Sequence, residues 1–262
     1  VHDDLCLLLT TSGSTGSPKM VRVSYKNLTS NAQAIAEYLA ISKADRPITT
    51  LPMCYAFGLS ILNSHMLCGA AVVLSDVTIV SREFWRQLNE HRATTFGGVP
   101  YTFEVLKRLR FERMTLPSLK YLTQAGGKLR GELVRHFVDI CESKSMKFFV
   151  MYGQTEATAR MSYVPWEHAR TKADSIGIPI PGGRFWIVDE QGQVVDEPNI
   201  AGELCYEGPN VCLGYACSCK DLERGDDNHG VLWTGDIARR DSDGFHYIVG
   251  RKARFLKVFG NR

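Results

Sequence analysis

The sequence lacks the features that mark several classes of protein. No apolar run approaches the ~18 residues of a membrane span, and the first residues, VHDDLC, lack the basic segment that opens a signal peptide. The formal net charge of +3 over 262 residues is small. It favours neither nucleic acid nor an anionic membrane as a partner. The composition, 44% apolar and 23% charged, is that of an ordinary globular protein.

A recognisable zinc-binding pattern is also lacking. Most of the eight cysteines lie in apolar stretches, where cysteine acts as a small hydrophobic residue. Cys212, Cys217 and Cys219 cluster, but their spacing matches no common zinc site, and no histidine pair lies near them. Free cysteines fit a reducing compartment, so we expect a cytoplasmic protein.

Residues 1–168 show the alternation of an α/β subdomain. Ser24 is placed to cap a helix, and the later helical segments are EFWRQLNEH, YTFEVLKRLR and GELVRHFVDICES. Between them lie strand-like runs: LCLLLTT, ITTLPM, AAVVLSD, ATTFGGVP, LKYLTQAGG and KFFVMYGQTE. This order predicts a parallel sheet with helices on both faces.

Three of these strands end in glycine-bearing segments, at 97–100, 125–127 and 152–154. In open α/β sheets, ligands bind beyond the carboxyl ends of the strands, and glycine lets a ligand approach the backbone closely. This edge of the sheet is therefore a candidate site.

Residues 169–249 show a different pattern of predicted secondary structure. Short strand-like runs are separated by Gly, Pro, Asn and Asp: RFWIVD, GQVV, GELCYEG, VLWTGD and FHYIVG. They predict a small antiparallel β subdomain, with a boundary in the polar stretch 165–175.

The loop TSGSTGSPK, which contains Lys19, combines hydroxyls, glycines and one lysine. Such loops bind phosphate through exposed backbone N–H groups and side-chain donors. Its spacing is not that of the G-x-x-x-x-G-K-[ST] loop. A flexible turn with a solvated lysine is the alternative for this loop taken alone.

Seven motifs in order resemble those of the adenylate-forming superfamily, which includes acyl-CoA synthetases and the adenylation domains of peptide synthetases. Together they span nearly the whole chain: TSGSTGSPK, AGGKL, YGQTEAT, SIGIPIPG, GELCYEGPNVCLGY, WTGD and GRKARFLK. The resemblance implies ATP-dependent formation of an acyl-adenylate with release of pyrophosphate, and then transfer to the thiol of coenzyme A or of a carrier protein's phosphopantetheine. It implies Mg²⁺ with ATP.

The resemblance also implies roles for single residues. Lys19 and Thr155 would act at the phosphates, Glu156 would hold Mg²⁺, and Tyr152 would stack on adenine. Taken alone, Glu156 reads as a helix-favouring acid. The remaining nucleotide-binding residues would be Thr11, Ser12, Gly13, Ser14, Thr15, Gly16, Gly126, Gly127, Gly153, Gln154, Asp236 and Arg251. Of these, Asp236 would bind the ribose; taken alone it reads as a turn aspartate.

The acyl pocket is expected around Tyr55, Phe57, Gly98 and Val99. Many family members have histidine where Tyr55 stands. No acidic residue lies in 51–75, and a buried substrate ammonium would need a carboxylate partner. This favours an acid without an α-amino group over an amino acid.

Both ends of the chain suggest the middle of a longer protein. Residues 250–262 resemble the family's hinge, although Ala253 stands where Asp or Lys is common. The family's catalytic lysine would lie beyond it, so we expect this chain alone to make little or no thioester. A non-catalytic nucleotide-binding module is the alternative from a different class.

Overall fold

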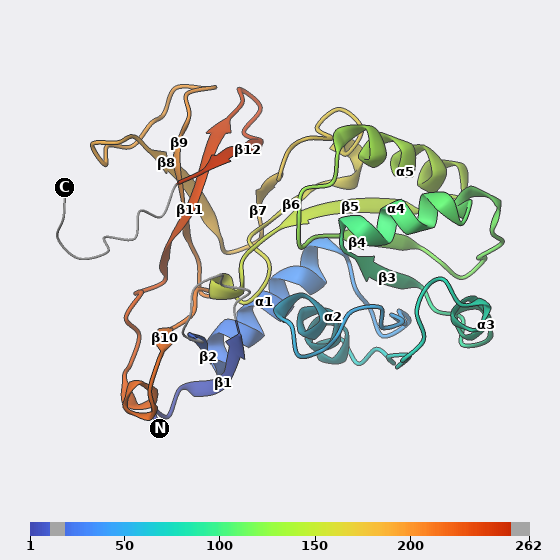
Figure 1. The fold of residues 1–262 in the computed structure, drawn as a ribbon, viewed down its shortest axis with the longest axis horizontal. Helices are drawn as coiled ribbons and strands as arrows, with labels where there is room; N and C mark the ends of the chain where they lie inside the picture. Colours follow the sequence, from blue (N-terminus) through green and yellow to red (C-terminus); the bar gives the residue numbers. More distant parts are fainter. Residues whose placement is uncertain (11–18, 253–262) are drawn as a thin grey trace, which may run out of the picture.

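The main layer of the protein is a five-stranded sheet of order β3-β4-β5-β6-β7, seen in a computed structural model that describes residues 1–10 and 19–252 (Figure 1). Neighbouring strands are parallel from β3 to β5 and antiparallel from β5 to β7. Their bounds are β3 Thr95–Gly98, β4 Tyr121–Gln124, β5 Lys147–Tyr152, β6 Ser162–Val164 and β7 Ile178–Pro179. The α/β expectation is confirmed, with a mixed sheet in place of a purely parallel one.

Helices cover both faces of this sheet because successive side chains of a strand point to opposite sides. On β5, Phe148 and Val150 pack into the core that includes helix α5 (Gly131–Ser143), whereas Phe149 packs with Ile35 of helix α1 (Tyr25–Tyr38). Ser24 caps α1 as expected, since its Oγ accepts a hydrogen bond from the Asn27 N–H at 3.0 Å. The helices are α1 Tyr25–Tyr38, α2 Ala56–Leu67, α3 Arg82–Glu90, α4 Pro100–Arg108 and α5 Gly131–Ser143.

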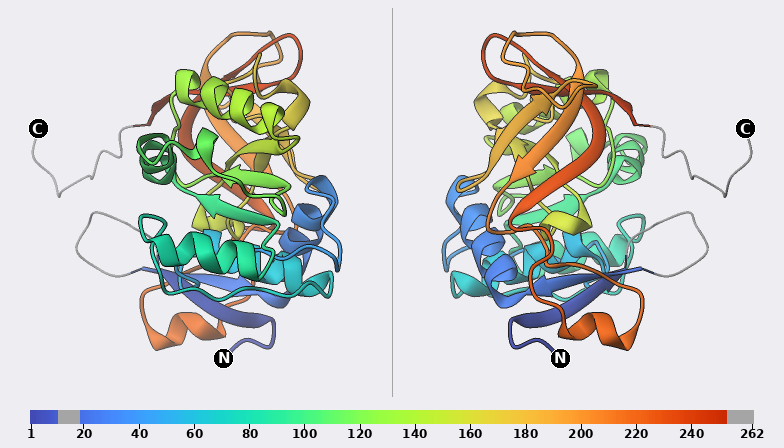
Figure 2. Two further views of the ribbon diagram at one scale, coloured as in Figure 1. Left: turned by 90° about the vertical axis from the view of Figure 1, so that its right-hand side faces the viewer. Right: turned by 90° about the vertical axis from the view of Figure 1, so that its left-hand side faces the viewer.

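Two antiparallel sheets complete the fold. A three-stranded sheet of order β1-β2-β10 comprises Leu5–Thr10, Met20–Ser24 and Gly214–Ala216. A four-stranded sheet of order β12-β11-β9-β8 comprises His246–Arg251, Val231–Arg240, Gly202–Glu207 and Arg184–Val188. Short 3₁₀ helices are η1 Phe111–Arg113, η2 Thr155–Ala157, η3 Trp166–His168 and η4 Cys219–Glu223. In the right-hand view of Figure 2, the four-stranded sheet stands in front of the green strands.

Some expected strands of the α/β layer are corrected by the structure. The runs 48–53 and 70–76 form no named strand and contribute only isolated bridges, Pro47 to Thr95 and Ile48 to Val73. Leu5–Thr10 of the run 5–11 form β1, but β1 pairs antiparallel with the next strand in a separate sheet. The run 192–195 contributes one bridge, Val188 to Val194. Apolar content alone does not separate a strand from an extended segment at the margin of a sheet.

A backbone junction ties the five-stranded sheet to the four-stranded one. Gly177, just before β7, forms an isolated bridge with His246 of β12, and the Ser175 hydroxyl donates to the His246 carbonyl at 2.7 Å. The chain crosses between the two sheets from Pro179 to Arg184, inside the segment 169–249 that the sequence assigns to the small subdomain. We retain the subdomain limits as a proposal.

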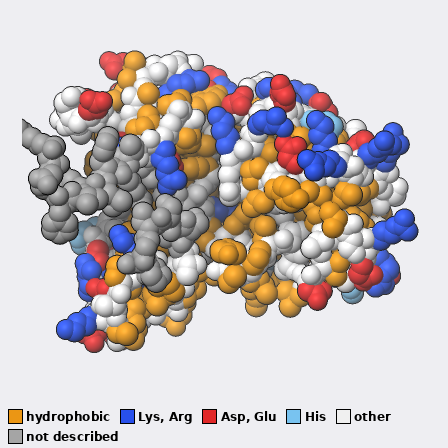
Figure 3. All heavy atoms as spheres, viewed as in Figure 1, with side chains coloured by type: hydrophobic (Ala, Val, Ile, Leu, Met, Phe, Trp, Pro, Cys, Tyr) orange, Lys and Arg blue, Asp and Glu red, His pale blue; other side chains and the backbone are white. Residues whose placement is uncertain are grey.

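The surface shows where apolar side chains stay exposed. In Figure 3, they gather between the positions of α4 and α2. Exposed large hydrophobic residues near the first turns of these helices are Met53, Tyr55 and Tyr101. None of the helices in residues 1–10 and 19–252 combines the length and the hydropathy of a membrane-spanning segment.

We predict that Gly177→Ala destabilises the protein much more than Gly192→Ala. Both glycines have positive φ, +88° and +80°, so alanine is strained at either position. That strain costs about 1 kcal/mol. A Cβ at Gly177 would also lie 1.9 Å from the Tyr163 carbonyl oxygen, whereas Gly192 has nothing within 4 Å. We expect losses of roughly 3 kcal/mol or more and about 1 kcal/mol in urea unfolding. Equal losses would contradict the close packing at the junction.

Candidate functional site

The carboxyl ends of β3, β4 and β5 meet at one edge of the sheet, because these strands are parallel. In Figure 1 they point toward the four-stranded sheet. A Cβ on Gly97 would lie 2.8 Å from Ile61 Cδ1, and one on Gly98 would lie 2.7 Å from Thr102 Cγ2. Glycine at these two positions therefore admits neighbouring side chains of the protein itself.

The turn after β4 contains the predicted nucleotide-binding residues Gly126 and Gly127. Gly126 has φ of +77°, a conformation that L side chains rarely adopt. The buried Gln124 holds the turn from within: its Nε2 donates to the carbonyls of Ala125 at 3.2 Å and Gly127 at 2.8 Å. The turn is thereby fixed against the end of its own strand.

Asp236 of β11 lies at the centre of a hydrogen-bonded cluster with residues that follow β5. The Tyr152 hydroxyl donates to Asp236 Oδ2 at 2.6 Å, and Gln154 Nε2 donates to the same oxygen at 3.0 Å. Gln154 Nε2 also donates to the Thr234 carbonyl at 3.0 Å. The structure thus brings together three of the predicted nucleotide-binding residues from two different sheets.

The two oxygens of the Asp236 carboxylate have different partners. Burial, and then the neighbouring Asp236 carboxylate, raise the pKa of the Tyr152 hydroxyl, so the hydroxyl stays protonated and acts as a donor. Both donors act on Oδ2. The other oxygen, Oδ1, lies 3.7 Å from Nε of Arg251, whose side chain is mostly exposed. One carboxylate oxygen is therefore fixed by the protein, and the other faces an exposed cation.

A second cluster forms around Tyr215 of β10. Its hydroxyl donates to Glu156 Oε1 at 2.7 Å, and Lys19 Nζ lies 5.7 Å from the centre of its ring. The other oxygen of Glu156, Oε2, has no partner among the described residues. The Cys212 N–H donates to the Glu156 carbonyl at 2.8 Å, which fixes η2 against the segment before β10. Lys19 and Glu156, far apart in sequence, thus share one neighbour.

Tyr215 was missed by residue-level reasoning, although it ends the motif GELCYEGPNVCLGY. The position of that tyrosine in the motif was the available signal. Thr155 begins η2 next to Glu156, and Gly153 is packed so closely that a Cβ there would lie 1.7 Å from the Ala159 carbonyl oxygen. Other predicted positions lie outside the described residues: Thr11, Ser12, Gly13, Ser14, Thr15, Gly16 and Ala253.

The predicted acyl-pocket residues gather at the starts of α2 and α4. Tyr55 precedes α2 and is 58% exposed, while Val99 precedes α4. A Cβ on Gly126 would lie 3.0 Å from Val99 Cγ1 and 4.0 Å from Phe57 Cδ1. Phe57 and Val99 therefore lie beside the turn that carries Gly126.

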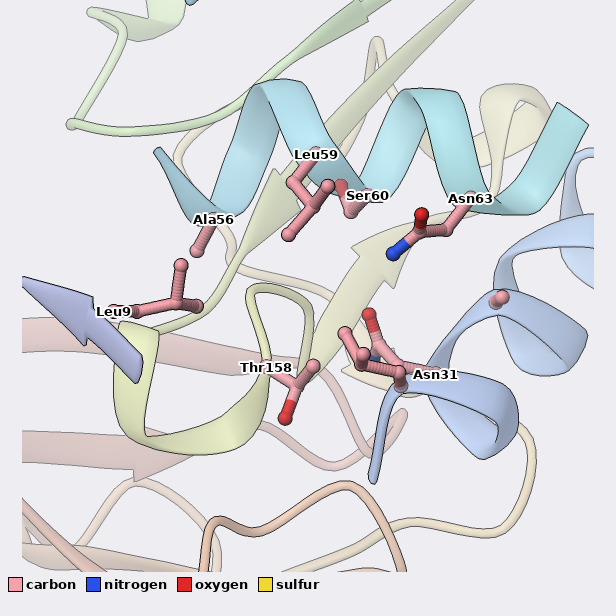
Figure 4. Close-up of a pocket in the computed structure, with 9 residues that line it drawn as sticks. Leu9, Asn31, Ala56, Leu59, Ser60, Asn63 and Thr158 are labelled. Carbon is pink, nitrogen blue, oxygen red and sulfur yellow. The ribbon is translucent and has the colours of Figure 1, made fainter. Parts of the chain in front are cut away.

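The structure also contains a small cavity. It is enclosed by β1, α1, α2 and the end of η2, as Figure 4 shows. The Oδ1 atom of the buried Asn31 has no hydrogen-bond partner among the residues that the structure describes. Residues that line the cavity include Leu9, Asn31, Ala56, Ser60, Asn63 and Thr158. None of the lining residues was predicted as a site residue.

The chain is similar to CoA ligases over nearly all of its length. It is 31% identical over 265 residues to oxalate–CoA ligase of Arabidopsis thaliana, covering 99% of this chain and 50% of the relative. It is 30% identical to 2-succinylbenzoate–CoA ligase of Bacillus subtilis, covering 97% and 50%. The chain spans about half the length of the curated relatives it matches.

The chain is also similar to solved structures of a coenzyme A synthetase. The o-succinylbenzoate coenzyme A synthetase of Bacillus subtilis in complex with AMP superposes with a TM-score of 0.82 at 29% identity, covering 96% of this chain and 50% of that one. The same enzyme in complex with ATP and magnesium ion gives a TM-score of 0.80. The family described as AMP-binding enzyme matches residues 1–216. The chain therefore belongs to the family of AMP-binding enzymes, within the adenylate-forming superfamily.

Proposed function

We propose that the full-length protein activates a carboxylic acid with ATP and transfers the acyl group to coenzyme A. The observation that carries this proposal is the contact of Tyr152 and Gln154 with Asp236, which joins the carboxyl edge of the main sheet to the four-stranded sheet. The resemblance assigns these residues to the adenosine. The names of the similar proteins, all CoA ligases in the cases above, support coenzyme A as the thiol. A carrier protein's phosphopantetheine remains the alternative acceptor.

The nucleotide would lie across this edge. Asp236 Oδ2 is held by two donors, so Oδ1 is the oxygen that we assign to the ribose hydroxyls, where a carboxylate accepts from O–H donors. Arg251 would move aside or turn to a phosphate. The Tyr152 ring would stack on adenine while its hydroxyl keeps the bond to Asp236. The turn Gly126–Gly127 would contact the base.

The phosphates would lie toward the Tyr215 cluster. There Lys19 supplies positive charge and Thr155 a hydroxyl donor, and Tyr215 holds one oxygen of Glu156. The described residues contain no group of three or more His, Cys, Asp or Glu side chains that could hold a metal. A single carboxylate with an unpartnered oxygen nonetheless fits Mg²⁺, which is commonly bound by one or two carboxylates and substrate phosphates. When bound with ATP, Mg²⁺ would neutralise charge on the phosphate oxygens.

The proposed reaction has two displacements. A carboxylate oxygen of the acid forms a bond to the α-phosphorus, and the bond from that phosphorus to the pyrophosphate oxygen breaks. The sulfur of coenzyme A then attacks the acyl carbon, AMP leaves, and the thiol proton passes to solvent or a base. In the first step, Lys19, Thr155 and Glu156 position the reacting groups and stabilise charge. An amino-acid substrate is disfavoured, because no acidic residue lies in 51–75.

We predict that the full-length protein exchanges labelled pyrophosphate into ATP only when a carboxylic acid is present. Adding coenzyme A should then give thioester and AMP. The assay is a panel of carboxylic acids, with the common amino acids as a second panel. Tight ATP binding with no exchange for any acid would favour a non-catalytic module, and exchange stimulated only by amino acids would overturn the choice of substrate class.

We predict that Asp236→Ala weakens ATP binding by about 1–3 kcal/mol, because it strands the Tyr152 hydroxyl and removes the ribose acceptor. Isothermal titration calorimetry measures the change. Asp196→Ala is the matched control, since Asp196 is an exposed aspartate in the loop between two strands of the same sheet. Unchanged affinity in Asp236→Ala would count against this placement of the nucleotide.

We predict that Glu156→Gln slows adenylate formation roughly 100-fold or more while it weakens binding of the acid by less than about threefold. The carboxylate would act mainly on charge that develops in the transition state. Pyrophosphate exchange at saturating Mg²⁺ gives the rate. Glu167→Gln, at an exposed glutamate in η3, should match the wild type. A Glu156→Gln rate equal to the wild type would remove Glu156 from the site.

A further inference from the structure

Arg160 is a buried cation beside the predicted acyl pocket. It follows η2 by three residues, and only 2% of it is exposed. Burying an ionised group is costly unless the charge is paired. Most buried arginines are therefore found with a carboxylate.

The partners of the Arg160 guanidinium are all neutral. Nε donates to Ser60 Oγ at 3.2 Å, and Nη1 lies 3.0 Å from the Tyr38 hydroxyl and 3.1 Å from Met151 Sδ. The guanidinium carbon lies 5.1 Å from the centre of the Phe57 ring. Nη2 has no hydrogen-bond partner among the described residues. Burial raises the pKa of the Tyr38 hydroxyl, so that group remains neutral too.

No acidic side chain elsewhere in the chain takes this role. Within residues 1–10 and 19–252, no carboxylate forms an ion pair with Arg160. The segments 11–18 and 253–262 contain neither aspartate nor glutamate. The sequence 51–75, which supplies Phe57 and Ser60, is also free of acidic residues.

Arg22 shows what a buried arginine with a structural role looks like in the same molecule. It is fully buried on β2 and forms an ion pair with Asp227. Its Nη1 and Nη2 also donate to the carbonyls of Leu213, Arg224 and Gly225. Arg22 therefore has the compensation that Arg160 lacks.

Arg160 lies close to the edge of the sheet where the acid would be activated, because both contact the Phe57 side chain. The ring of Phe57, on which the guanidinium lies, is itself close to the glycine ends of two strands: a Cβ on Gly97 would be 3.3 Å from Phe57 Cζ. Phe57 is thus shared between the guanidinium and the edge of the sheet where the acid would be activated. In Figure 4, Ser60, the partner of Arg160 Nε, lies on α2 one turn after Ala56.

We infer that Arg160 receives a second anionic group of the substrate, so that the acid is a dicarboxylic acid whose distal carboxylate accepts hydrogen bonds from the guanidinium. The inference rests on the proposed function and names the substrate class of that site. An arginine suits this task because its planar donors match a carboxylate, and charge-assisted bonds are strong where water is excluded. The positive charge of Arg160 also repels a substrate ammonium group. This agrees with the absence of aspartate and glutamate from residues 51–75.

The test is pyrophosphate exchange with the full-length protein and matched acids. The probes are the linear dicarboxylic acids from malonate to suberate, each compared with the unbranched monocarboxylic acid of equal chain length. We expect at least one dicarboxylic acid to have a kcat/KM about tenfold or more above its monocarboxylic partner. In Arg160→Gln that kcat/KM should fall about 100-fold, while the value for the monocarboxylic acid changes less than about threefold. The ratio of the two kcat/KM values, measured on one preparation of a variant, does not depend on the fraction of that protein that is folded.

Two variants serve as controls. Arg160→Lys keeps the charge without the planar donors and should retain an intermediate ratio. Arg22→Gln removes a buried arginine elsewhere and should lower stability without changing the ratio. The inference is overturned if the wild type prefers every monocarboxylic acid, or if Arg160→Gln lowers both members of a pair equally. Absence of exchange with any acid would instead overturn the proposed function itself.

Discussion

The burial of β5 on both of its faces is the constraint on which the rest of the molecule depends. Phe148 and Val150 anchor the strand to the core on one side, and Phe149 anchors it to α1 on the other. A strand held in this way cannot slip by one residue, because the slip would exchange its two faces. The residues that leave its carboxyl end, Tyr152 to Glu156, are therefore delivered to a fixed place.

Polar contacts between distant segments then convert this fixed edge into a site. Tyr152 and Gln154 carry the end of β5 to Asp236 on β11, and Glu156 is held by Tyr215 on β10. Each of the three sheets thus contributes a side chain to one of these two polar clusters. Of the two arginines that are buried within the described residues, Arg22 forms an ion pair with Asp227, whereas the hydrogen-bond partners of the Arg160 guanidinium there are all neutral.

The sequence predicts local structure better than it predicts partners. The helix over 131–143 matches its predicted segment. The spacing of its apolar residues and its two ends depend on residues that are close together in the sequence. The segments at 48–53 and 70–76 are as apolar as true strands, but pairing depends on what lies beside them. The motifs locate Tyr152 and Asp236 in the chain, yet their bond joins residues 84 apart. Nothing local to Arg160 indicates that its neighbours would all be neutral.

The hydrogen bonds at Asp236 also have a thermodynamic consequence. They cross from the main sheet to the four-stranded sheet, as does the backbone junction at Gly177 and His246. A ligand that bonds to Asp236 only in this arrangement must stabilise the alignment of the two sheets. By reciprocity, whatever stabilises that alignment from outside the site raises the affinity for the ligand by the same factor. The alignment of the sheets and the occupancy of the site are therefore linked equilibria.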